Sequence, residues 1–179
     1  MLTVAPPDAI ELRANATFEA LMWALSRPGD SRDMPEAGLA SIAETLVDLE
    51  CTVFADDPSL RARIATTGAL AAEDIAEADH VFLSSLEGAE ARLAALRCGS
   101  ALYPDDGATL VANVRHGVCQ RVRLSGPGID GALEITLGMA PGFWAMRAML
   151  CAYPEGFDML LVDGLSVIGI PRSTQVEVL

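Results

Sequence analysis

Segments with helical and strand-like patterns alternate along the first half of the chain, and this alternation restricts the fold more than any other feature. Two segments carry apolar residues at the spacing of one helix face, namely Phe18, Leu21, Met22 and Leu25 in the first and Leu39, Ile42, Leu46 and Leu49 in the second. Apolar runs typical of buried strands occupy 52–54 and 79–83, and further helices are expected over 59–65 and 85–96. Such an order favours parallel strand pairing, since parallel neighbours need a crossover connection.

Local signals predict where two of these helices begin or end. Asn15 or Thr17 is expected to cap the first helix, and the Ser26-Arg27-Pro28-Gly29 segment is expected to end it. Gly99 is expected to end the helix over 85–96, because glycine adopts a left-handed backbone without strain.

The second half of the chain has a different pattern. Strand-like runs over 109–114, 120–124 and 132–137 are separated by turn-rich segments and predict antiparallel sheet. A helix is expected to start near Gly142, and strands over 157–162 and 165–170 flank Asp163-Gly164, the signature of a two-residue hairpin. The whole pattern predicts an α/β fold over residues 1–179 as a single domain, with three α/β/α layers around a mixed sheet.

The chain contains no lysine, because all twelve of its Lys-plus-Arg side chains are arginine. A Schiff base with pyridoxal phosphate needs a side-chain primary amine, and a P-loop needs a lysine at the terminal phosphates. Neither chemistry can be built from these residues, so no pyridoxal phosphate cofactor is expected. Coding bias remains an alternative explanation for the missing lysine.

Charge and hydropathy give expectations about partners and location. A formal net charge of −13 disfavours nucleic acid as a partner and leaves a basic protein surface open as one. No apolar run approaches the roughly 18 residues that cross a bilayer, and the first residues lack the pattern of a secretory signal, so a cytoplasmic location without membrane contact is expected. The 51% hydrophobic content suggests that another subunit covers some apolar surface.

The cysteines and histidines give no sign of a metal site. The four cysteines contain no Cys-x-x-Cys pair, and neither histidine has a potential ligand beside it at helical spacing. The cysteines are interpreted as small buried apolar residues. No local pattern connects the serines to a histidine, so no catalytic residue is assigned.

Five residues are candidates for ligand binding. Arg172, with Thr174 nearby, is able to grip a phosphate or carboxylate, and the alternative is that it caps a backbone carbonyl or pairs with one of the chain's many acids. Gly126 and Gly128 flank a proline in a segment whose backbone amides could hold an anion, or which simply forms a tight connection. Arg27 is a weaker candidate with the same two interpretations as Arg172, which are binding of an anion or a contact within the fold.

Several motifs, taken in order, resemble a known family. They are Ser26-Arg27-Pro28-Gly29, Tyr103-Pro104-Asp105-Asp106-Gly107, Leu124-Ser125-Gly126-Pro127-Gly128, Phe143-Trp144, Tyr153-Pro154-Glu155-Gly156 and Ile170-Pro171-Arg172-Ser173-Thr174. Each motif is unspecific alone, but their order along nearly the whole chain resembles the PhnH family, subunits of the bacterial carbon–phosphorus lyase system.

The resemblance implies a homodimer-forming, accessory or non-catalytic subunit. Its complex would couple ATP and an alkylphosphonate into a ribose phosphonate triphosphate and release adenine, with other subunits carrying the chemistry. The fold implied is a reduced pyridoxal-phosphate-dependent transferase fold without the cofactor site, which agrees with the missing lysine. An alternative function is a nucleotide- or phosphonate-binding site at a subunit boundary.

Overall fold

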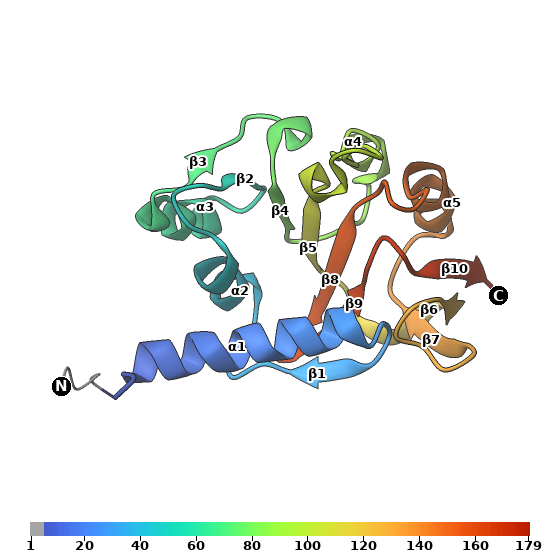
Figure 1. Ribbon diagram of the computed structural model, residues 1–179, viewed down its shortest axis with the longest axis horizontal. Helices are drawn as coiled ribbons and strands as arrows, with labels where there is room; N and C mark the ends of the chain where they lie inside the picture. The colour runs from blue at the N-terminus through green and yellow to red at the C-terminus, as the bar shows by residue number, and fades with distance from the viewer. Residues whose placement is uncertain (1–5) are drawn as a thin grey trace.

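The computed structural model describes residues 6–179 and shows an α/β fold around a seven-stranded sheet (Figure 1). The strands of this sheet, in the spatial order β1-β9-β8-β5-β4-β2-β3, are β1 (Ser31–Asp33), β9 (Ser166–Ile170), β8 (Asp158–Asp163), β5 (Thr109–Asn113), β4 (His80–Leu83), β2 (Thr52–Ala55) and β3 (Leu70–Ala71). Neighbours from β8 to β3 pair in parallel, whereas β9 pairs antiparallel with both β8 and β1. The predicted α/β class with a mixed sheet is therefore confirmed.

A second, smaller sheet was not predicted as a separate unit. It contains β6 (His116–Ser125), β7 (Leu133–Leu137) and β10 (Gln175–Val178) in the antiparallel order β10-β6-β7. The expectation that the strand over 109–114 joins this antiparallel group was wrong, because β5 lies between β4 and β8 in the parallel sheet. Its continuous apolar run, Leu110 to Ala112, is buried on both faces, as is usual for a central parallel strand.

Helices cover both faces of the main sheet. They are α1 (Ala9–Ser26), α2 (Leu39–Leu46), α3 (Pro58–Ile64), α4 (Glu90–Leu93) and α5 (Pro141–Leu150). Successive side chains of a strand point to opposite faces, so Phe82 packs in a cluster with α1, α2 and α3. Val81 and Leu83 instead pack in a second cluster that includes residues of α4, α5 and the small sheet. Among residues 6–179, no helix is both long and apolar enough to cross a membrane.

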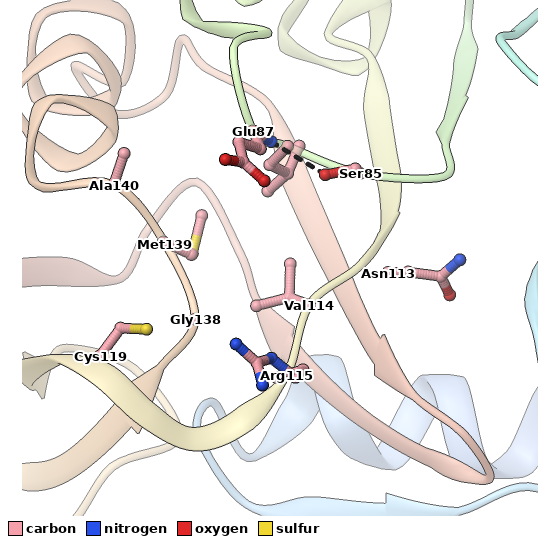
Figure 2. A pocket seen from close by; sticks show the side chains of 10 residues that line it. Ser85, Glu87, Asn113, Val114, Arg115, Cys119, Gly138, Met139 and Ala140 are labelled. Carbon is pink, nitrogen blue, oxygen red and sulfur yellow. Dashed lines mark hydrogen bonds between the residues drawn. The ribbon is translucent and has the colours of Figure 1, made fainter.

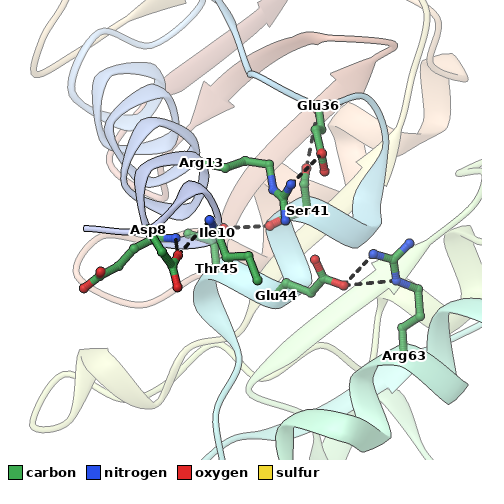
Figure 3. Close-up of polar contacts among 9 residues, drawn as sticks. Asp8, Ile10, Arg13, Glu36, Ser41, Glu44, Thr45 and Arg63 are labelled. Atoms are coloured by element: carbon green, nitrogen blue, oxygen red, sulfur yellow. Dashed lines mark hydrogen bonds and ion pairs between the residues drawn. The ribbon is translucent and has the colours of Figure 1, made fainter. Parts of the chain in front are cut away.

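Helix α1 begins earlier than predicted. Its cap is Asp8, whose Oδ1 accepts hydrogen bonds of 2.8 Å from the backbone N–H groups of Ile10 and Glu11 (Figure 3). Asn15 and Thr17 therefore lie inside the helix instead of capping it. An aspartate with extended backbone satisfies the free N–H groups of the first turn, and this local signal outweighs the later Asn and Thr.

The buried face of α1 also differs from the predicted one. Leu21 is fully buried, but Phe18 and Met22 are exposed. Small residues, among them Ala20 and Ala24, are buried against the sheet instead. The reason is the close approach of α1 to β9, where Gly169 leaves no room for larger side chains. The expected end of the helix at Ser26 is confirmed.

Polar contacts connect the three helices on this face (Figure 3). Arg13 of α1 forms an ion pair of 3.1 Å with Glu36, just before α2. Glu44 of α2 accepts a hydrogen bond of 3.1 Å from Nε of Arg63 on α3. Because these pairs are exposed, each is expected to stabilise the packing of the helices by only about 0–1 kcal/mol.

The predictions for the remaining helices and the hairpin had mixed outcomes. Helices α2 and α3 are confirmed, although Leu49 lies beyond α2 and is exposed. The helix expected over 85–96 is reduced to α4, because turns interrupt the segment on both sides. Gly99 has a left-handed φ of 67° but ends no α-helix. The hairpin is confirmed, with Asp163 opposite Ser166.

Candidate functional site

Arg172 forms a partly buried ion pair that joins three parts of the fold. Its Nη2 lies 2.6 Å from Oδ2 of Asp158 at the start of β8, and its backbone N–H donates to Oδ1 of the same residue at 2.8 Å. Its Nη1 donates to the carbonyl oxygen of Pro104. Hydrogen bonding to Asp158 raises the pKa of the Arg172 guanidinium. Of the two interpretations of Arg172, the structure therefore shows the one in which it pairs with an acid, Asp158.

The Gly126–Gly128 turn is packed between two other candidate segments. A Cβ at Gly128 would collide with the carbonyl oxygen of Ser26 at the end of α1, and one at Gly126 would lie 3.0 Å from the carbonyl oxygen of Ser173. Both glycines also have positive φ angles. The structure therefore brings this turn against the ends of α1 and β9, beside a cavity of about 310 Å³.

Arg27 and Thr174 have different surroundings. The Arg27 guanidinium stacks over the ring of Trp23, 4.9 Å from its centroid, as Arg32 does at 4.8 Å. Thr174 is buried, and its hydroxyl has no hydrogen-bond partner. Arg27 is thus engaged with an aromatic ring, whereas Thr174 retains an unused polar group.

A cavity of about 500 Å³ lies where the parallel strands β4 and β5 end (Figure 2). Ligands of open α/β sheets bind in crevices at the carboxyl ends of the strands. The polar side chains that line it are Ser85, Glu87, Asn113, Arg115 and Cys119. None of these residues was singled out from the sequence as a site residue, because their proximity depends on the parallel pairing of β4 with β5 and on β6.

Two features give this crevice its chemical character. Arg115 forms no ion pair within residues 6–179 and is exposed, so its guanidinium is free to hold an acidic group. Cys119 has an unusual φ of 68° in an irregular part of β6. Cys119 is exposed, and the other three cysteines are partly buried, which corrects the expectation that all four are buried. The lining is suited to binding a polar ligand.

A second cavity, about 370 Å³, lies between α5 and the segment 172–176. Arg147 of α5 lines it and is only 3% exposed. It donates to the carbonyl oxygens of Thr174 at 3.1 Å and Pro171 at 2.7 Å. Arg147 was not predicted as a site residue from the sequence. A single charged residue among the apolar residues of a buried helix face could have indicated it, because arginine is rarely buried without a partner.

The two histidines lie in different surroundings. Burial lowers the pKa of His80, whose Nδ1 has no hydrogen-bond partner. His116 Nε2 lies 3.2 Å from the carbonyl oxygen of Leu161, and its backbone N–H donates to Asp163. Within residues 6–179, no group of three or more His, Cys, Asp or Glu side chains is arranged to hold a metal ion.

Comparison with known proteins identifies the family. Residues 9–177 match the model of the family described as bacterial phosphonate metabolism protein (PhnH). The chain is also similar to the putative C-P lyase subunit protein HtxG of Stutzerimonas stutzeri, with 34% identity over 180 residues, covering 92% of this chain and 86% of that protein. The match spans both sheets and all five helices, and so it takes in the whole fold described above. This chain therefore belongs to the PhnH family of bacterial phosphonate metabolism proteins.

Proposed function

We propose that this chain is an accessory subunit of a carbon–phosphorus lyase core complex in organic phosphonate catabolism. The observation that carries the proposal is its similarity, over nine-tenths of its length, to a protein described as a putative C-P lyase subunit. The reaction proposed for the complex couples ATP and an alkylphosphonate into a ribose phosphonate triphosphate and releases adenine. The role proposed for this chain is assembly of the complex.

The surface of α1 supports an assembly role. Five of its large apolar residues are exposed, namely Ile10, Leu12, Phe18, Met22 and Trp23. Phe18 and Met22 are four residues apart and therefore neighbours on the helix surface. Large apolar side chains that are neighbours on an exposed surface, as these two are, are typical of surfaces that contact another protein.

Three further expectations belong to this proposal. The chain forms a homodimer, acts in the cytoplasm and has a sheet derived from a pyridoxal-phosphate-dependent transferase fold without the cofactor. The mixed sheet with helices on both faces is compatible with such an origin. The absence of lysine supports the loss of the cofactor, because no side chain offers the amine for a Schiff base.

Deletion of the gene for this chain is expected to abolish growth on methylphosphonate as the sole phosphorus source. Growth on inorganic phosphate is expected to continue, because an accessory lyase subunit serves only phosphonate use. A plasmid that carries the wild-type chain should restore growth on methylphosphonate. Growth rates of the deletion strain on the two phosphorus sources provide the measurement, and unchanged growth on methylphosphonate would contradict the proposal.

A further inference from the structure

Arg147 carries a buried charge that no carboxylate neutralises. Its guanidinium bonds only backbone carbonyl oxygens, and no ion pair to it exists within residues 6–179. Asp158 is held by Arg172 at 2.6 Å and forms no ion pair with Arg147 among the described residues. A buried charge without a counter-charge is costly, so this site favours an anion.

Three polar groups around the same cavity have no partner. They are Nε of Arg147, Nε1 of Trp144 and the hydroxyl of Thr174, and each residue is 2–3% exposed. All three residues line the cavity of about 370 Å³ between α5 and the segment 172–176. The guanidinium and indole N–H groups only donate hydrogen bonds, and a hydroxyl also donates. Three donors without an acceptor are complementary to a ligand with several acceptor oxygens.

We propose that this cavity binds the tetrahedral oxyanion of a phosphate or phosphonate compound, with Arg147 as the counter-charge. Trp144 and Thr174 donate hydrogen bonds to the same oxyanion after small side-chain rotations. The cavity is larger than one such group and has room for an organic substituent. The ligand class is therefore a small phosphonate or phosphate ester. This inference concerns a ligand site and does not depend on the proposed role in assembly.

Tryptophan fluorescence provides a direct test. The chain has two tryptophans, Trp23 and Trp144, so the Trp23→Phe variant reports only on the indole inside the proposed site. Its emission is expected to change saturably when methylphosphonate is added. Parallel titrations with inorganic phosphate, ATP and acetate distinguish a phosphonate from free phosphate, a nucleotide and a simple carboxylate. Acetate that binds as well as methylphosphonate would overturn the ligand class.

Substitution of Arg147 tests the counter-charge. Arg147→Met keeps the length of the side chain, removes its charge, and is expected to weaken binding of the preferred oxyanion by roughly 10- to 100-fold, measured by calorimetry. Arg61→Met, which removes an exposed guanidinium outside the cavity, is expected to bind as wild type. Equal weakening in both variants would indicate an adventitious ion only.

Two milder substitutions cover the possibility that Arg147→Met does not fold. Thr174→Val and Trp144→Phe each remove one donor and preserve most of the side-chain shape, so each is expected to weaken binding several-fold. Folding of each variant is checked by its thermal unfolding without ligand. Wild-type affinity in both folded variants, or no saturable signal with any of the phosphorus compounds, would overturn the proposal.

Discussion

Replacement of Gly169 by alanine is expected to reduce the free energy of unfolding by about 3 kcal/mol. A Cβ on Gly169 would lie 2.5 Å from the backbone C and O atoms of Ala24 and 2.7 Å from the backbone N of Leu25. These atoms belong to α1, so no side-chain rotation relieves the contact. Gly169 is paired with Leu160 in the buried strand β8, and β9 therefore cannot move away either. The helix has to lift from the sheet.

Chemical denaturation of the wild type and the variant measures this effect. Gly142→Ala provides a matched control, because Gly142 lies in α5, has no atom within 4 Å of an added Cβ and needs no positive φ. The control is expected to be as stable as wild type, since alanine is the better helix former. A Gly169→Ala variant with wild-type stability would show that α1 does not approach β9 as closely as described.

The Asp158→Asn variant is expected to lose roughly 3 kcal/mol of stability. The side chains of Asp158 and Arg172 are only 24% and 15% exposed, so solvent screens their attraction weakly. Removal of the carboxylate charge leaves the partly buried guanidinium of Arg172 without its counter-charge. The amide oxygen of asparagine is still able to accept the hydrogen bond from the backbone N–H of Arg172. The expected loss of stability therefore comes mainly from the missing negative charge.

A surface ion pair supplies the control for this variant. Glu44 pairs with Arg63 at 2.5 Å, but both side chains are well exposed. Glu44→Gln is therefore expected to change the unfolding free energy very little. Similar losses in Asp158→Asn and Glu44→Gln would contradict the view that the Asp158–Arg172 pair holds the ends of β8 and β9 together.

The main elements of the fold could be predicted because their signals are local. The strands β4 and β8 carry continuous apolar runs, and the Asp163-Gly164 turn selects a hairpin by its own backbone preferences. The strands that were missed, β1, β3 and β10, are two to four residues long. Such short strands form because they pair with segments that are distant in the sequence, as β10 pairs with β6. The periodicity of a few neighbouring residues does not predict a pairing of this kind.

The buried face of α1 was assigned incorrectly for a related reason. The apolar spacing of Phe18 and Met22 fits a buried face, but the sheet accepts only small residues where Gly169 meets Ala24. Which face packs inward is decided by the partner surface, and that surface comes from a strand more than a hundred residues away. A sequence pattern of one helix does not contain this information.

The candidate site residues show the same limit. The sequence identified Arg172 as an anion-binding candidate, but only the fold reveals that Asp158 engages it and that Arg147 is the guanidinium without a counter-charge. Thr174 was predicted and does line the cavity of Arg147, whereas the Gly126–Gly128 turn faces a different cavity. The ligand-binding role of the five predicted residues stays a prediction.

Co-expression with the other subunits of the carbon–phosphorus lyase core complex tests the proposed role most directly. An affinity tag on one partner subunit is used to isolate the assembly, and the proteins that co-purify are identified by mass spectrometry after size-exclusion chromatography. We expect this chain to elute with the partner subunits at a fixed ratio. Isolation of the complete partner assembly without this chain, while the chain itself is expressed and folded, would contradict the account.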